Sequence, residues 1–130
     1  MEASTPTISV VDDDESIRKA LRRLVRSAGL CVATFASAEE FLACEGEEAA
    51  CLILDVRLPG MSGLDLQRHL ASAGRCVPII FISARDDEQT SQAALAAGAL
   101  AFLAKPFDDR LLLDAVARAL EKGEAEHPNP

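Results

Sequence analysis

The stretch of sequence that decides the fold is residues 51–63, which read CLILDVRLPGMSG. Apolar residues that lead into an acid and then into a loop with proline and glycine are typical of a strand buried on both faces. Asp55 therefore lies at the carboxyl end of a central strand. Ligands of open α/β sheets bind at that edge, so an acid here is placed for chemistry. Taken alone, the stretch is explained equally well by a helix-capping or loop aspartate.

The composition predicts one globular domain. The chain has 130 residues, of which 49% are hydrophobic and 26% charged, and this suits a single core of ordinary size. The net charge of −8 argues against nonspecific nucleic-acid binding, which requires basic groups. No apolar run approaches the roughly 18 residues that span a bilayer, and Met1–Ser4 does not resemble a signal peptide. We therefore expect a cytoplasmic protein with no membrane partner.

The cysteines have no CxxC spacing, and three of the four lie in or beside apolar runs. Buried free thiols are the favoured interpretation over disulfides or metal ligands. The four positions are Cys31, Cys44, Cys51 and Cys76.

Strand-like and helix-like segments alternate along the chain. Five short apolar runs read as strands, at residues 7–11, 31–35, 51–55, 78–82 and 101–104. Each is followed by a helical pattern, and the first, third and fourth of these end at Gly29, Gly74 and Gly98. Capping residues begin three of the helices: Ser37 in a capping box with Glu40, Ser62, and Asp108. Five such pairs predict a parallel α/β sheet covered on both faces.

Two segments differ from the rest. The helix expected over 88–97 has an apolar face made mostly of alanine, with Leu95 as its only large side chain. Alanines bury little area, so this helix should be the easiest to shift. Residues 123–130 are polar and contain two prolines, which predicts a domain over 1–122 followed by a flexible tail or the start of a linker.

Polar side chains follow four of the predicted strands at the same edge of the sheet. Asp12 and Asp13 follow the first strand and Asp55 the third, and these two strands should be neighbours. At about 5 Å and an effective dielectric of ~20, each pair of carboxylates repels by roughly 3 kcal/mol. A cation must offset this, and Mg²⁺ prefers such hard oxygen ligands. Lys105, after the fifth strand, supplies a further positive charge.

A carboxylate beside a divalent cation and a lysine is suited to accept a phosphoryl group. Asp55 would be the nucleophile, Lys105 would neutralise charge on the transferred oxygens, and Ser83 after the fourth strand would donate a hydrogen bond to one of them. Capping, surface and turn roles explain these residues one at a time, but not their occurrence together at successive strand ends.

From about Thr7 to Leu120 the chain resembles the receiver domain of bacterial two-component response regulators. The motifs that carry the resemblance are VVDDD at 10–14, LDVRLPGMSG at 54–63, Ser83 with Ala84, and KPF at 105–107. They look most like the subgroup of regulators with a C-terminal helix-turn-helix output domain, of which no part is recognised in these 130 residues.

The resemblance implies a flavodoxin-like (βα)5 fold, a doubly wound parallel sheet with strand order 2-1-3-4-5. It implies Asp55 as the phosphorylated residue, and Asp12, Asp13, Asp55 and the carbonyl of Arg57 as Mg²⁺ ligands. Ser83 and Phe102 become the switch residues, while Arg57 and Arg85 occupy positions that tune dephosphorylation. The Lys105–Pro106 bond is expected to be cis.

The implied function is a phosphorylation-controlled switch rather than a conventional enzyme, with phosphotransfer and dephosphorylation catalysed by the domain itself. A sensor histidine kinase would be the donor. The face formed by the fourth helix, fifth strand and fifth helix would change to control transcription and could form a phosphorylation-dependent homodimer. DNA would be reached only through an output domain.

Three alternatives stay open at this stage. A phosphohydrolase of the haloacid-dehalogenase type normally requires a second Asp two positions after the nucleophile, where this chain has Arg57. A degenerate receiver that docks partners without phosphorylation would more often lack one of the acids or Lys105. A flavin-binding domain shares the sheet order, but the acidic loop after the first strand would repel a phosphate.

Overall fold

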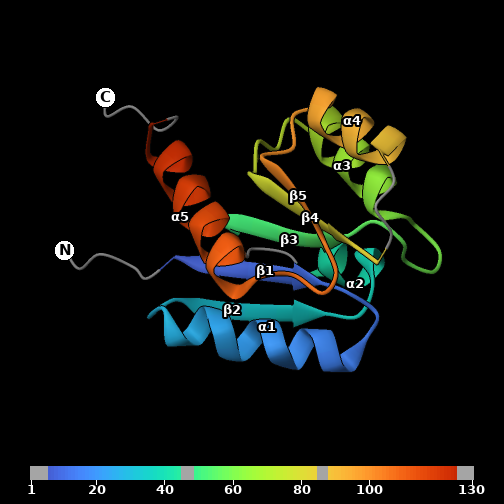
Figure 1. The fold of residues 1–130 in the computed structure, drawn as a ribbon. Helices are drawn as coiled ribbons and strands as arrows, with labels where there is room; N and C mark the ends of the chain where they lie inside the picture. The colour runs from blue at the N-terminus through green and yellow to red at the C-terminus, as the bar shows by residue number, and fades with distance from the viewer. Residues whose placement is uncertain (1–5, 45–48, 85–87, 126–130) are drawn as a thin grey trace.

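The computed structural model describes residues 6–44, 49–84 and 88–125. Its five strands form one parallel sheet in the order β2-β1-β3-β4-β5, which confirms the predicted topology (Figure 1). The strands are β1 (Thr7–Val11), β2 (Cys31–Phe35), β3 (Cys51–Asp55), β4 (Ile79–Ser83) and β5 (Ala101–Ala104). The fourth strand is displaced by one residue from the prediction, because Pro78 has no N–H to donate to the sheet.

The helices cover both faces of the sheet. They are α1 (Glu15–Ser27), α2 (Ala38–Ala43), α3 (Gly63–Ser72), α4 (Glu88–Ala96) and α5 (Asp109–Ala125). Helices α1 and α5 lie on one face, and α2, α3 and α4 lie on the other (Figure 1). Within the described residues, no helix is long and apolar enough to cross a membrane.

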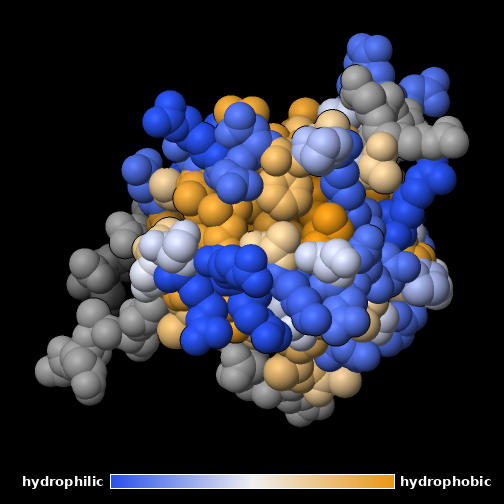
Figure 2. Space-filling model, turned by 60° about the horizontal axis from the view of Figure 1, so that its bottom comes forward, coloured by the Kyte–Doolittle hydropathy of each residue, from blue (hydrophilic) through white to orange (hydrophobic). Residues whose placement is uncertain are grey.

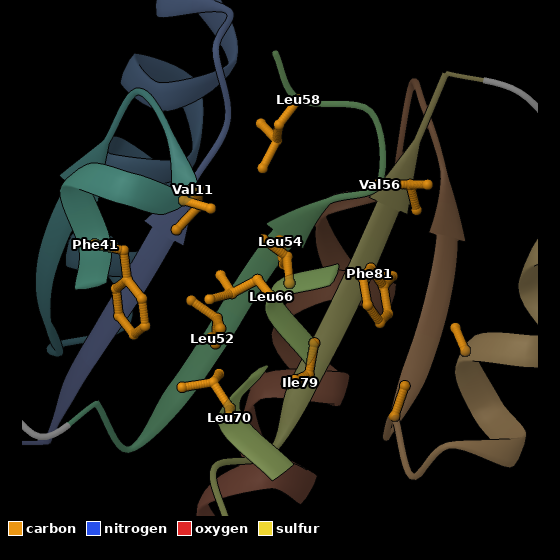
Figure 3. Close-up of a cluster of buried hydrophobic side chains, with 13 residues drawn as sticks. Val11, Phe41, Leu52, Leu54, Val56, Leu58, Leu66, Leu70, Ile79 and Phe81 are labelled. Carbon is orange, nitrogen blue, oxygen red and sulfur yellow. The ribbon is translucent and has the colours of Figure 1, made fainter. Parts of the chain in front are cut away.

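The strands divide their side chains between two cores. All five positions of β3 and all five of β4 are buried, as expected for covered parallel strands. Leu52, Leu54 and Phe81 face α2, α3 and α4, whereas Ile53 and Ile80 face α1 and α5 (Figure 3). Both cores therefore fix β3, and with it Asp55, in the middle of the sheet.

The helix caps agree with the sequence patterns except at α2. Ser62 and Asp65 form a complete capping box on α3, and Asp108 caps α5 by accepting from the N–H groups of Arg110 and Leu111. Ser37 caps α2 by accepting from the N–H of Glu40. The reciprocal bond of the predicted box is missing, since the Glu40 carboxylate accepts from Ala36 N–H instead.

Helix α4 is held to the sheet by very little apolar area. Ala94 is its only buried residue. Leu95, the one large apolar residue of the helix, does not face the core and is 45% exposed. On the side of the molecule drawn in Figure 2, a band of hydrophobic surface is bordered by strongly hydrophilic residues. Helix α4 therefore has even less apolar contact with the rest of the domain than the sequence pattern predicted, because Leu95 is exposed.

The cysteines correct one prediction. All four are free, but only Cys51 is buried, whereas Cys31, Cys44 and Cys76 are exposed. Cys31 begins β2, Cys44 directly follows α2 and Cys76 lies in the loop before β4, positions where an apolar neighbour in sequence does not guarantee burial. Burial raises the pKa of the Cys51 thiol to about 12.

Some predictions fall outside the described residues. Arg85 belongs to this group, as do residues 126–130 of the expected tail. Helix α5 continues to Ala125, past the boundary expected at residue 122. The domain boundary itself stays a prediction.

Candidate functional site

Four strands bring polar side chains to one edge of the sheet. Asp12 follows β1, Asp55 ends β3, Ser83 ends β4, and Lys105 follows β5. Asp12, Asp55 and Ser83 are all buried, with exposed fractions of 0%, 5% and 3%. Burying polar groups costs free energy unless they are paired. A cluster of buried polar groups at one edge of the sheet is therefore a candidate functional site.

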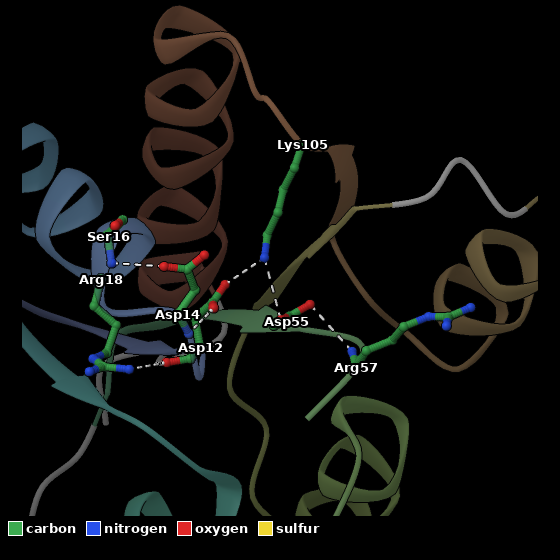
Figure 4. Close-up of polar contacts among 7 residues, drawn as sticks. All are labelled: Asp12, Asp14, Ser16, Arg18, Asp55, Arg57 and Lys105. Carbon is green, nitrogen blue, oxygen red and sulfur yellow. Dashed lines mark hydrogen bonds and ion pairs between the residues drawn. The ribbon is translucent and has the colours of Figure 1, made fainter. Parts of the chain in front are cut away.

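Lys105 lies between the two buried carboxylates. Its Nζ is 2.9 Å from Asp12 Oδ2 and 3.4 Å from Asp55 Oδ2 (Figure 4). The lysine side chain is 15% exposed, so water screens these ion pairs only weakly. The peptide bond between Lys105 and Pro106 is cis, as the resemblance implied.

Asp12 is held from several sides. Its Oδ1 accepts a hydrogen bond of 2.8 Å from the N–H of Asp14, and its backbone carbonyl accepts one of 2.7 Å from Arg18 Nη1 (Figure 4). Its Oδ2 is fully enclosed and is paired with Lys105 Nζ at 2.9 Å. Because a carboxylate oxygen has more than one lone pair, Oδ2 has capacity for a second cation beside Lys105.

The three consecutive acids have separate roles. Asp14 is the N-cap of α1, and its Oδ1 accepts a hydrogen bond of 2.8 Å from the N–H of Ser16. Asp12 turns inward, while Asp13 is exposed at the same edge. Helix capping was the alternative explanation for all three acids, and the structure assigns that role to Asp14.

Asp55 has a perturbed environment. Burial raises the pKa of its carboxyl group, and the nearby charge of Asp12 raises it further. Lys105 and the N–H of Arg57, which is 3.3 Å from Asp55 Oδ1, act in the opposite direction but do not cancel the shift. Burial alone would lower the pKa of Lys105, but its hydrogen bond and charge interactions with Asp12 and Asp55 outweigh burial and raise the pKa.

Three carboxylates form a group that could hold a metal ion. One oxygen from each of Asp12, Asp13 and Asp55 lies within 4.8 Å of the others. Hard oxygen donors in this number suit Mg²⁺, and the enclosed Asp12 Oδ2 has lone-pair capacity for such an ion in addition to Lys105. The side chain of Arg57 extends away from Asp55, so only its backbone is available at the site (Figure 4).

The two predicted switch residues lie on β4 and β5. The carbonyl of Ser83 accepts a hydrogen bond of 2.7 Å from the N–H of Lys105, which ties the ends of β4 and β5 together. Phe102 is half-buried and packs against Phe81, with ring centroids 6.2 Å apart. Phe102 thus rests on the same core that supports β3.

Sequence reasoning missed two residues that support the site. Arg18 reaches across from α1 to the carbonyl of Asp12. Glu39 on α2 accepts a hydrogen bond of 3.0 Å from the N–H of Met61, which fixes the loop after Asp55. Gly60 in that loop has φ +75°, and a Cβ there would lie 2.7 Å from the Glu39 carboxylate, so a larger residue would displace Glu39.

Gly63 keeps the start of α3 close to the acid. A Cβ at this position would collide with the carbonyl oxygen of Asp55, while the Gly63 N–H donates to the carbonyl of Val56 at 2.9 Å. The fold therefore requires glycine here for a close backbone approach rather than for an unusual φ.

Comparison with known proteins identifies the family. Residues 8–117 match the response regulator receiver domain, so the chain belongs to this family. It is 47% identical to the response regulator protein TmoT of Ectopseudomonas mendocina over 99% of this chain, and 50% identical to nodulation protein W of Bradyrhizobium diazoefficiens over 93%. Among solved structures it resembles the response regulator StyR, with a TM-score of 0.88 and 44% identity over 95% of this chain and 63% of that one.

A structure of a response regulator receiver protein from Burkholderia phymatum covers 89% of this chain at 47% identity, with a TM-score of 0.78. The curated relatives are longer than the chain, which spans 59% of TmoT and 54% of nodulation protein W. The chain is thus a receiver domain of a two-component response regulator, and phosphorylation of an aspartate is the mechanism of this family.

Proposed function

We propose that Asp55 is the phosphorylated residue of this receiver domain and that phosphohistidine of a sensor histidine kinase is the donor. The observation that carries the proposal is the position of Lys105 Nζ, within 3.4 Å of Asp55 and 2.9 Å of Asp12. A cation at this position would lie beside the oxygens of a phosphoryl group on Asp55 and could pair with them.

Mg²⁺ is the cofactor that the acidic residues favour. Asp12, Asp13 and Asp55 would hold it with their carboxylates and Arg57 with its backbone carbonyl. Bound there, the ion would supply positive charge beside the transferred oxygens. One or two of the three carboxylates would bind the ion directly and the remaining one through water, since Mg²⁺ usually takes only one or two carboxylates directly.

The chemistry is an in-line transfer. A carboxylate oxygen of Asp55 attacks phosphorus, the P–O bond forms as the P–N bond to histidine breaks, and the imidazole nitrogen keeps the electron pair. Lys105 pairs with a phosphoryl oxygen and the Ser83 hydroxyl donates a hydrogen bond to another. Hydrolysis of the acyl phosphate by water returns the carboxylate, so the domain catalyses its own phosphorylation and dephosphorylation without being a conventional enzyme.

Phosphorylation would act as a switch through β4 and β5. Drawing Ser83 and Lys105 toward the phosphoryl group pulls on the ends of both strands, which their 2.7 Å backbone bond already couples. Phe102 would repack against Phe81, and the weakly held α4 would move. Shifting a population from 1:99 to 99:1 takes about 5.5 kcal/mol, which a few charge-assisted hydrogen bonds of ~1.5–3 kcal/mol each can supply.

The partners follow from this switch. The α4-β5-α5 face would control a transcriptional output and support a phosphorylation-dependent homodimer. Relatives include the transcriptional regulatory protein FixJ of Azorhizobium caulinodans, at 37% identity over 97% of this chain. DNA would be bound by a helix-turn-helix output domain, because the net charge of −8 makes direct contact with DNA unfavourable for these residues.

Intact-mass measurement tests the site. Incubation with Mg²⁺ and acetyl phosphate should add one phosphoryl group to the protein, and Asp55→Asn should abolish the addition. Asp114→Asn, which changes an exposed aspartate on α5, is the matched control and should leave the addition unchanged. Undiminished labelling of the Asp55 variant would reject the assignment.

A further inference from the structure

We propose that Gln67 of α3 fixes the carboxyl-terminal end of α4, so that α4 pivots about that end when the domain switches. Gln67 is then a positioning residue, because it acts on α4 and not on the phosphoryl group. The contact is a property of the fold, whereas its role in switching rests on the proposed function.

The contact joins a buried side chain to a helix backbone. Gln67 is only 5% exposed, and its Nε2 donates a hydrogen bond of 3.1 Å to the carbonyl of Ala94 on α4. Burying an amide costs free energy unless it is hydrogen-bonded, while a methionine would fill a similar volume without that cost. The buried amide is therefore explained by its bond to α4, which lies beside α3 (Figure 1).

The Ala94 carbonyl lies where α4 ends. It also accepts a hydrogen bond of 3.0 Å from the N–H of Ala99, and the N–H of Gly98 donates to the carbonyl of Leu95 at 3.0 Å. Gly98 has φ +109°, so these two bonds form the glycine-dependent turn that closes the carboxyl-terminal end of many helices. Gln67 binds the same carbonyl as this cap and therefore ties the cap to α3.

Burial of α4 is concentrated at this same end. Ala94 is 0% exposed and Ala99, just beyond the helix, is 9% exposed. No other residue of α4 is buried, and Glu88 at the start of the helix is exposed. The amino-terminal part of α4 therefore adds little buried area to hold the helix in place.

The two ends of α4 lie at opposite ends of the sheet. Helix α4 follows Ser83, the last residue of β4 at the acidic edge. Its carboxyl-terminal turn leads to Leu100, whose N–H donates to the carbonyl of Ile79, the first residue of β4, at 2.8 Å. The end held by Gln67 is thus the end farther from Asp55. A pull on Ser83 would move the amino-terminal end of α4 and turn the helix about the Gln67 bond.

Hydrogen exchange of the Gln67 side-chain amide reports the contact directly. In NMR spectra recorded without Mg²⁺ or a phosphoryl donor, the Gln67 N–H bonded to Ala94 should exchange at least about tenfold more slowly than the amide of Gln92, an exposed residue of α4. Gln67→Met removes the donor and should speed exchange of the backbone N–H groups of residues 97–99 about two- to tenfold.

Gln92→Met is the matched control. It makes the same substitution in α4 at a side chain whose amide bonds only within the helix, to Glu88, and it should leave exchange at 97–99 unchanged. The buried backbone amides of β3 report that each variant keeps its fold. Equal exchange at 97–99 in Gln67→Met and in the natural chain would overturn the assigned contact.

Activation tests the pivot. Beryllofluoride with Mg²⁺ is the stable stand-in for the phosphoryl group, and Asp55→Asn is the blank. We expect backbone exchange to change at residues 92–93 while the Gln67 side-chain amide stays protected. Loss of that protection would show that α4 moves as a unit, and an unchanged rate at 92–93 would show that its amino-terminal half does not move; either result overturns the pivot.

Failure of the proposed function and failure of the Gln67 contact are distinguishable. The intact-mass measurement shows by itself whether Asp55 is phosphorylated. The comparison of Gln67→Met with the natural chain uses no activator, so it tests the contact whatever the outcome at Asp55.

Discussion

Replacing Lys105 by methionine should destabilise the metal-free protein by about 3–4 kcal/mol at pH 7. The lysine is the only cation paired with Asp12 and Asp55 in the described residues, at 2.9 and 3.4 Å. At about 3 Å and an effective dielectric of ~20, each attraction is worth roughly 5 kcal/mol before desolvation. Removing one partner of a buried ion pair typically costs ~3–5 kcal/mol, because the remaining charge is left uncompensated.

Protonation of Asp12 or Asp55 in the variant would remove the uncompensated charge, so the free energy of that protonation is an upper limit on the loss of stability. Raising the pKa of one carboxylate from about 3.9 to 7, so that it takes up a proton, costs about 4 kcal/mol. A raised pKa in the folded state means that the loss is present at pH 7 and shrinks as the pH falls toward the unfolded value. At pH 5 the limit is therefore only about 1.5 kcal/mol.

Urea denaturation at the two pH values measures the effect. With a slope of about 1.5 kcal/mol per M, the midpoint at pH 7 should fall by about 2–3 M. Mg²⁺ should recover more stability in the variant than in the natural chain, since the lysine and the ion compete for the same carboxylates. Lys105→Arg keeps the charge and should lose less.

Lys19→Met is the matched surface control. Lys19 pairs with Glu15 at 3.4 Å, but both side chains are about two-thirds exposed, at 68% and 70%. Its loss should cost under about 1 kcal/mol at either pH. A loss for Lys105→Met as small as this control, or one equally large at pH 5 and pH 7, would refute the assignment of Lys105 as the counter-ion of a buried acidic pair.

Three further predictions concern residues around the site and the core. Asp13→Ala should weaken Mg²⁺ binding in calorimetry while changing the unfolding free energy little, because the residue is exposed; unchanged Mg²⁺ affinity would remove it from the ligand set. Glu39→Ala should cost only about 0.5–1.5 kcal/mol but slow labelling by acetyl phosphate, since the loop after Asp55 loses its bond to α2. Alkylation of the native protein should modify three thiols, with Cys51 reacting only after denaturation because its pKa is raised to about 12; fast modification of all four would contradict its burial.

Much of the fold was predictable because local patterns carry it. Residues 51–55 are apolar at four successive positions and end in an acid, and they form the fully buried β3. Ser62 caps α3 and Asp108 caps α5, as their spacing to the helices predicted. Burial and capping of this kind depend on residues close in sequence, so they leave a readable pattern.

The convergence of acidic residues with Lys105 was predictable for a related reason. Parallel strands all end at one edge of the sheet, so residues that follow successive strands must meet there. The sequence order of the elements was enough to bring Asp12, Asp55 and Lys105 together. The sequence did not show which oxygen pairs with which nitrogen, nor that Asp14 caps α1 while Asp12 turns inward. Both depend on the backbone direction in the three-residue loop 12–14 between β1 and α1.

Tertiary structure alone decided the contacts between distant surface positions. Glu39 and Met61 lie 22 residues apart and meet because α2 packs beside the loop after β3. Leu95 faces solvent and Cys76 is exposed, although both are apolar in type, because exposure depends on which elements pack against them. Gln67 and Ala94 are 27 residues apart in sequence and meet for the same reason, since α3 and α4 cover the same face of the sheet and the Gln67 amide donates to the Ala94 carbonyl at 3.1 Å.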